Sequence, residues 1–300
     1  MPDNQNRRNA IKNILVGSAA LGSSSILSSF DTPENSKKNK LQLKANINHS
    51  VCQWCYGSVP LNELCIAVKE MGFTAIDLIG PKDWPVLQQY GIYSSMCYHG
   101  GAVSLTNGFN NKTYHGQLIK DYEAVIPLMV KAGYKDVICF SGNRNGMDDE
   151  TGLKNCVEGL KPIVSTAEKN GITVHMELLN SKIDHKDYMC DKTAWGVELC
   201  KRLGSQNFKL LYDIYHMQID EGDVIRTIQD NHQYFGHYHT GGVPGRNEID
   251  ETQELYYPAI MKAIVATGYK GYVAQEFIPT GKDNKSKLEA LKKAVIICDV

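Results

Sequence analysis

The sequence predicts a single α/β domain, a (β/α)8 TIM barrel over residues 45–300, and three observations lead to this prediction. Short apolar runs alternate with longer amphipathic segments eight times along this stretch, as in repeated βα units. Its length is close to the ~250 residues typical of a closed barrel. The first apolar run is not followed by a glycine-rich phosphate turn, which disfavours the second candidate, an open doubly wound sheet.

Eight strands and eight helices are expected in strict alternation. Glycines stand where each of six helices must end before the next strand begins; these are Gly72, Gly91, Gly133, Gly171, Gly204 and Gly268. The expected strands are 47–53, 74–79, 92–98, 136–141, 172–178, 208–214, 234–240 and 272–277. The expected helices are 61–71, 83–90, 115–132, 151–169, 192–203, 222–231, 255–267 and 285–297.

The segment before the barrel divides into two parts. Arg7-Arg8 and the mildly apolar run that follows to residue 30 resemble a twin-arginine export signal, although Ala10 stands where a bulky aromatic is usual and no A-x-A cleavage site follows. Residues 31–44 are polar and are expected to form a tether. We therefore expect export to the periplasm, with no membrane span in the mature protein; a membrane-tethered or a cytoplasmic protein is the alternative.

Composition narrows the class of partner. The chain is 42% hydrophobic with a formal net charge of -1, so nothing favours nucleic acid, and a small-molecule substrate is expected. A homo-oligomer is compatible with this composition. The odd number of cysteines, nine, argues against a disulfide framework. Cys52 and Cys55 form the only CxxC, which is compatible with a redox pair or half a zinc site, but we expect both thiols to pack as small apolar groups.

One predicted strand contains an anomalous charge. Asp213 lies within the apolar and aromatic run 210–216, which is typical of a strand covered on both faces. A carboxylate buried alone is costly, so Asp213 must be paired, hydrogen-bonded or bound to a metal ion.

Three other strands place a metal-competent side chain near the same end, where the active site of a barrel is built. A single such Glu is more often a salt-bridge partner and a single His a core residue, but four on consecutive strands favour a metal site. The four are Glu177, Asp213, His239 and Glu276. Their oxygen and nitrogen atoms suit one divalent ion, with Mn²⁺, Mg²⁺, Co²⁺ and Zn²⁺ as the candidates.

With these motifs in place, residues 48–298 resemble the xylose isomerase-like TIM barrels, the sugar isomerase and epimerase group, and most closely the hydroxypyruvate isomerase-like branch. The segments that carry the resemblance are 50–56, 140–144, 211–218, 236–239 with 243–246, and 275–277. The resemblance implies that the four residues above hold one divalent ion and that Glu177 and Glu276 act as the acid/base pair. It also implies that His216 and Arg246 contact the substrate. One departure is His239, since hydroxypyruvate isomerases commonly have Gln there and ketose 3-epimerases have His.

The implied chemistry is proton transfer beside a carbonyl group through an enediolate. A divalent ion stabilises the developing negative charge, and two carboxylates remove and return the proton. We therefore expect a metal-dependent isomerase of a small hydroxy acid or sugar, such as one converting hydroxypyruvate to tartronate semialdehyde. The alternative is a ketose 3-epimerase or an aldose-ketose isomerase. A metal-dependent phosphodiesterase or AP-endonuclease-like nuclease and a non-catalytic sugar-binding barrel are less favoured.

Further candidates lie around this centre. Arg246 could pair with a substrate carboxylate or form a rim salt bridge to Glu248 or Asp250. His216 could be a substrate contact, a fifth ligand or a core residue, and it reaches the centre only if the strand ends near Asp213. The remaining substrate-binding candidates are Arg144 as a second anion contact, Trp54 as a pocket wall, and His99 and Asn180, either of which could instead satisfy backbone groups.

Overall fold

The computed structural model describes residues 41–101 and 104–300, and it confirms the predicted barrel. Eight parallel strands form one sheet in the order β1-β8-β7-β6-β5-β4-β3-β2. A parallel bridge between Cys52 and Asp77 joins the ends of the sheet and closes the barrel. The strands are β1 (Asn48–Val51), β2 (Ala75–Ile79), β3 (Tyr93–Cys97), β4 (Asp136–Cys139), β5 (Thr173–Glu177), β6 (Phe208–Asp213), β7 (Phe235–Thr240) and β8 (Tyr272–Gln275).

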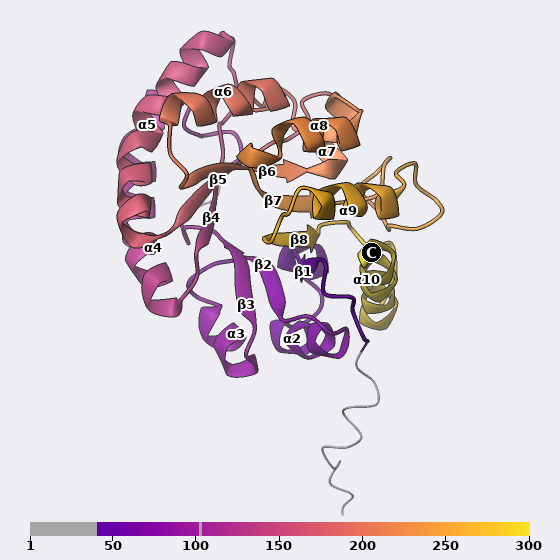
Figure 1. The fold of residues 1–300 in the computed structure, drawn as a ribbon. Helices are drawn as coiled ribbons and strands as arrows, with labels where there is room; N and C mark the ends of the chain where they lie inside the picture. Colours follow the sequence, from indigo (N-terminus) through magenta and orange to yellow (C-terminus); the bar gives the residue numbers. More distant parts are fainter. Residues whose placement is uncertain (1–40, 102–103) are drawn as a thin grey trace, which may run out of the picture. The chain divides into compact units, whose positions relative to one another are not determined.

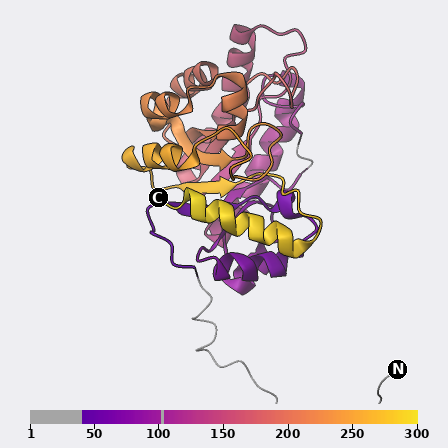
Figure 2. The same ribbon diagram turned by 90° about the vertical axis from the view of Figure 1, so that its right-hand side faces the viewer.

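The helices lie outside the strands (Figure 1). Those expected from the sequence are α2 (Leu61–Glu70), α3 (Trp84–Tyr90), α4 (Lys112–Ala132), α5 (Asp149–Asn170), α6 (Thr193–Leu203), α8 (Val224–Asn231), α9 (Tyr257–Ala266) and α10 (Asn284–Cys298). In both views α10 lies between α9 and α2, so the last βα unit is next to the first (Figures 1 and 2).

The predicted elements agree with the structure to within three residues at each boundary. All six glycines expected at helix ends have a positive φ, the conformation in which glycine costs least. Two differences lie at the carboxyl ends of strands: a 3-10 helix, η1 (Gln53–Tyr56), follows β1, and a short helix, α7 (Ile214–Asp220), follows β6 without a loop. A second 3-10 helix, η2 (His232–Tyr234), precedes β7.

The barrel interior contains polar side chains as well as apolar ones. Ser50 and Ser95 share a hydrogen bond of 2.5 Å, and His175 donates to Asp136 over 2.8 Å. All nine cysteines are free and buried, which confirms that Cys52 and Cys55 pack in the core in this structure.

The N-terminal predictions concern mostly residues that the structure does not describe. The expected signal, 1–30, and most of the expected tether, 31–44, lie outside the described residues, so export stays a prediction. Among the helices of residues 41–101 and 104–300, none has the length and apolar character needed to cross a bilayer.

A glycine in β7 makes room for a buried histidine. A Cβ at Gly236 would lie 2.5 Å from Cε1 of His175, which is 1% exposed. We expect Gly236→Ala to lower the free energy of unfolding by about 1–3 kcal/mol through overpacking, measured by urea denaturation. The control is Gly116→Ala on α4, where no atom lies within 4 Å of the added Cβ and a gain of about 0.5–1 kcal/mol is expected. Equal effects of the two substitutions would contradict this packing.

Candidate metal centre and active site

The four predicted ligands come together at the carboxyl ends of consecutive strands. Glu177 is the last residue of β5 and Asp213 the last of β6; His239 lies near the end of β7, and Glu276 directly follows β8. One donor atom from each lies within 4.8 Å of the others, and all four residues are buried. The sequence therefore located this cluster correctly.

The orientation of His239 fits a metal ligand. Its Nδ1 atom is buried and lacks a hydrogen-bond partner of acceptable geometry among the described residues. Nevertheless Nδ1 lies 2.6 Å from Oε2 of Glu276 and 3.3 Å from Oε1 of Glu177. The imidazole nitrogen and the two carboxylate oxygens are therefore close enough to one another to bind a single ion. Three carboxylates and one imidazole suit Mn²⁺, Mg²⁺, Co²⁺ or Zn²⁺, so the residues fit a divalent ion.

Burial and mutual repulsion separate the proton affinities of the three carboxylates. Burial raises the pKa of Asp213 to about 7. Burial also raises the pKa of Glu177, and the charge of Glu276 raises it further. Burial opposes ionisation of Glu276 as well, but Arg246 and His239 hold its pKa well below the usual range. Ionisation is therefore favoured at Glu276 and disfavoured at Glu177, the two residues of the predicted acid/base pair.

Arg246 forms ion pairs with two of the four predicted ligands. Its Nη2 atom donates to Oδ2 of Asp213 over 3.0 Å and to Oε2 of Glu276 over 2.5 Å. Its guanidinium carbon lies 5.3 Å from the ring centroids of both Trp54 and Tyr215. The positive charge is thus fixed at the edge of the cluster by two carboxylates and two aromatic faces.

The alternative partners proposed for Arg246 are engaged elsewhere. Glu248 accepts hydrogen bonds from the backbone and hydroxyl of Thr280. Asp250 accepts from Thr252 and pairs with Lys293. The rim salt bridge is therefore not the arrangement in this structure.

His216 follows Asp213 by three residues and therefore reaches the cluster only if the strand ends at Asp213. The structure shows that β6 does end there. Asp213 caps α7, with Oδ1 accepting from the backbone N–H of Tyr215 over 2.8 Å and of His216 over 3.3 Å. The Nε2 atom of His216 then lies 3.6 Å from Oδ2 of Asp213. Helix α7, which the sequence did not predict, therefore places this side chain.

Asn180 determines which nitrogen of His216 carries the proton. The Oδ1 atom of Asn180 accepts from the backbone N–H groups of Ile183 and Asp184, so its Nδ2 must be the donor. Nδ2 donates to Nδ1 of His216 over 2.6 Å. The proton is consequently on Nε2, which is buried without a hydrogen-bond partner among the described residues. Burial, assisted by the charge of Arg246, lowers the pKa of His216 well below its ordinary value, so the ring is a neutral donor aimed at the cluster.

Trp54 contacts Glu276, one of the two predicted catalytic glutamates. Its indole Nε1 donates to Oε1 of Glu276 over 2.7 Å, while 44% of the residue remains exposed. The side chain thus donates to one glutamate and leaves part of its ring exposed beside it, and its place in a pocket wall stays a prediction.

Two predicted substrate contacts have other partners. The guanidinium of Arg144 pairs with Asp149 and Asp191 and donates to the backbone carbonyl of Met189. His99 accepts from the backbone N–H of Gly101 over 3.1 Å. Among the described residues neither contacts the four ligands, so these two predictions gain no support from the structure.

The sequence reasoning missed Asp77. This residue of β2 is fully buried, and its Oδ2 accepts from Nε2 of His239 over 3.2 Å. The available signal was a lone carboxylate within the apolar run 75–79, the same signal that singled out Asp213.

The sequence profile of the xylose isomerase-like TIM barrels matches residues 65–294, and the chain belongs to this family. It is 34% identical over 123 residues to the 2-oxo-tetronate isomerase of Cupriavidus necator, covering 41% of this chain and 46% of that protein. It is 28% identical over 125 residues to a putative hydroxypyruvate isomerase of Homo sapiens, covering 42% and 45%. These matches span about half the length of each relative.

A solved structure supports the fold. The D-psicose 3-epimerase of Clostridium cellulolyticum H10, with D-tagatose, superimposes with a TM-score of 0.67 over 85% of this chain and 100% of that chain. At 18% sequence identity this likeness establishes the shared barrel alone.

We expect the affinity for Mn²⁺ to rise with pH up to about 7. A divalent ion must displace the proton that Asp213, with a pKa of about 7, holds at lower pH. The pKa values of Glu177 and His239 are raised as well, so the ion displaces at least one proton, and the affinity should rise about tenfold or more per pH unit below that value. Titration by Mn²⁺ electron paramagnetic resonance at constant ionic strength measures this dependence. An affinity that is flat between pH ~5.5 and ~7 would contradict the protonation state assigned to Asp213.

Proposed function

We propose that this protein is a divalent-metal-dependent isomerase of a small hydroxy-carbonyl compound, with hydroxypyruvate as the first substrate to test. The observation that carries the proposal is the buried cluster in which two glutamates with opposite pKa shifts flank one imidazole. Relatives named as 2-oxo-tetronate and hydroxypyruvate isomerases support the same class of reaction. The four residues Glu177, Asp213, His239 and Glu276 would hold the ion.

In this proposal the two glutamates divide the proton transfer. The bound ion supplies Lewis-acid polarisation of the substrate oxygens. Glu276, whose pKa is lowered, removes the proton from the carbon beside the carbonyl group, and Glu177, whose pKa is raised, returns a proton to the former carbonyl carbon. The hydroxyl proton passes from the first substrate oxygen to the second, so that one carbonyl group and one hydroxyl group exchange places. Trp54 and Arg246 hold the Glu276 carboxylate in place while it acts.

The substrate would be oriented by two donors beside the ligands. His216 offers its unpartnered Nε2–H to a substrate oxygen. Arg246 would contact a substrate carboxylate from its fixed position against Asp213 and Glu276, which motivates a hydroxy acid over an uncharged sugar.

A ketose 3-epimerase is the second candidate, and His239 is the observation that favours it. The same cluster can invert a carbon beside a carbonyl group if the two glutamates act on opposite sides of one carbon. The substrate alone separates the two activities.

We further propose export of the protein to the periplasm, on the basis of Arg7-Arg8 and the mildly apolar run that follows to residue 30.

A substrate panel tests the proposal. The purified protein is loaded with Mn²⁺ or Mg²⁺ and supplied with hydroxypyruvate, 2-oxo-tetronate and free ketoses, and products are followed by NMR. We expect turnover of a hydroxy acid. Turnover of ketoses alone would replace the proposal by the epimerase, and binding without turnover across the panel would identify a non-catalytic barrel.

We expect Glu276→Gln to lower kcat by about 10²- to 10⁴-fold, because the amide cannot accept the proton. The matched control is Glu158→Gln on α5, where the carboxylate is exposed and pairs with Lys112, and its kcat should stay within about twofold of wild type. Equal kcat values for Glu276→Gln and wild type would rule out this mechanism.

A further inference from the structure

Asp77 lies beneath the metal centre and contacts two histidines of β7. Its Oδ2 accepts a hydrogen bond from Nε2 of His237 over 2.6 Å as well as the one from Nε2 of His239 over 3.2 Å. The two histidines are two residues apart on one strand, so both rings point to the same face, here the barrel interior. All three side chains are at most 2% exposed.

The backbone of β2 is distorted at this residue. The pairing of β2 with β3 shifts register on both sides of Asp77, which marks a bulge. The next residue, Leu78, has a φ of 58°, a conformation that residues other than glycine adopt rarely. Its backbone N–H donates to Oδ1 of Asp77 over 3.0 Å. Bulges redirect side chains, and this one fixes the carboxylate that faces the two histidines.

We propose that Asp77 is a positioning residue that fixes the tautomer and orientation of His239 so that Nδ1 faces the divalent ion. By accepting from Nε2, the carboxylate keeps a proton on that nitrogen and leaves the Nδ1 lone pair directed toward Glu177 and Glu276. The inference rests on the metal centre of the proposed function. Carboxylates that hold the far nitrogen of a metal-binding histidine typically contribute about 10- to 100-fold in metal affinity.

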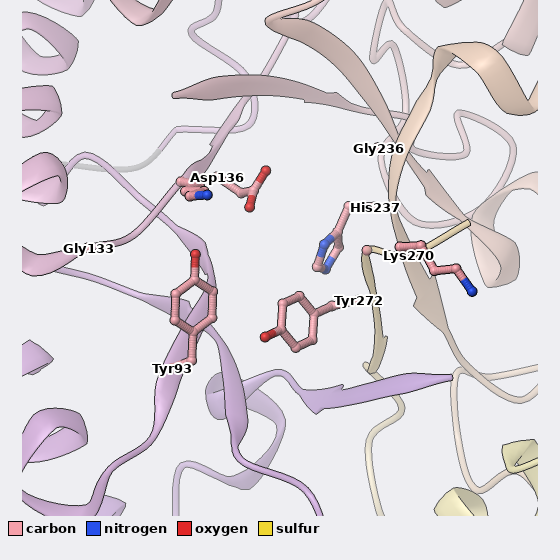
Figure 3. A pocket seen from close by; sticks show the side chains of 9 residues that line it. Tyr93, Gly133, Asp136, Gly236, His237, Lys270 and Tyr272 are labelled. Carbon is pink, nitrogen blue, oxygen red and sulfur yellow. The ribbon is translucent and has the colours of Figure 1, made fainter. Parts of the chain in front are cut away.

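His237 donates to the same carboxylate oxygen of Asp77, Oδ2, as His239 does. It also lines a hollow of about 380 Å³ at the amino ends of the strands, on the opposite face from the metal centre. Figure 3 shows the His237 ring between Asp136 and Tyr272 in this hollow. Asp77 is therefore contacted by one histidine that lines the hollow at the amino ends of the strands and by His239, the predicted ligand near the carboxyl ends.

One competing arrangement uses the same atoms. Cys52, Asp77 and His239 each offer a donor atom within 4.8 Å of the others, and Sγ of Cys52 lies 3.7 Å from Nε2 of His239. A second ion bound there would make Asp77 a ligand instead of a positioning residue. Metal stoichiometry distinguishes the two arrangements.

The test compares Mn²⁺ affinity and stoichiometry by isothermal titration calorimetry in wild type and Asp77→Asn, a substitution that conserves volume. The expected result is one ion per chain in both proteins and a Kd raised about 10- to 100-fold in the variant. The control is Asp136→Asn, which makes the same chemical change at the Asp136–His175 pair of the same barrel. It is expected to lower the unfolding midpoint without changing the Kd.

Several results would overturn the inference. A Kd for Asp77→Asn within about twofold of wild type, or an equal rise for Asp136→Asn, would reduce Asp77 to a structural role. Two ions per chain in wild type, falling to one in Cys52→Ser, would make Asp77 a ligand. If wild type binds no Mn²⁺, the proposed metal centre is wrong, and the positioning role proposed for Asp77 is wrong as a consequence. Co²⁺ absorption provides an independent readout, since the ligand-field bands of Asp77→Asn should shift while those of Asp136→Asn match wild type.

Discussion

The structure depends on three carboxylates placed together where water is almost excluded. Glu177, Asp213 and Glu276 are at most 4% exposed and lie within 4.8 Å of one another and of His239. Such a group is stable only when positive charge or bound protons compensate it. Arg246 supplies part of that charge, and a divalent ion at the shared point would supply the rest.

The barrel supports this centre from two directions. The strand ends carry the four predicted ligands, and the segments that follow them add Arg246, Trp54 and His216 around the carboxylates. From within the barrel, Asp77 holds the far nitrogen of His239. The site therefore involves both the loops at the carboxyl ends of the strands and the polar residues inside the barrel. The bulge in β2 belongs to the second group, because it contains Asp77.

Local patterns in the sequence were sufficient for the eight βα units and the four clustered residues, because alternation, helix-ending glycines and strand-end polar residues are local signals. What the sequence could not provide depends on contacts between distant residues. Arg144 and Arg246 have similar local sequence signals, since one follows a strand end and the other a turn. Only the fold reveals their partners. Arg144 pairs with Asp149 and Asp191, whereas Arg246 pairs with Asp213. Helix α7 was missed because the apolar run continues without interruption through its start. Asp77 stands out in the sequence as a carboxylate within an apolar run. Its contact with His239 could not be predicted, because the two residues are 162 positions apart.

The most direct test is the position of bound Mn²⁺ in crystals of the protein, determined from anomalous scattering. The account predicts one ion per chain, coordinated by Glu177, Asp213, Nδ1 of His239 and Glu276. An ion held instead by Cys52, Asp77 and Nε2 of His239, or no ion at saturating Mn²⁺, would contradict it.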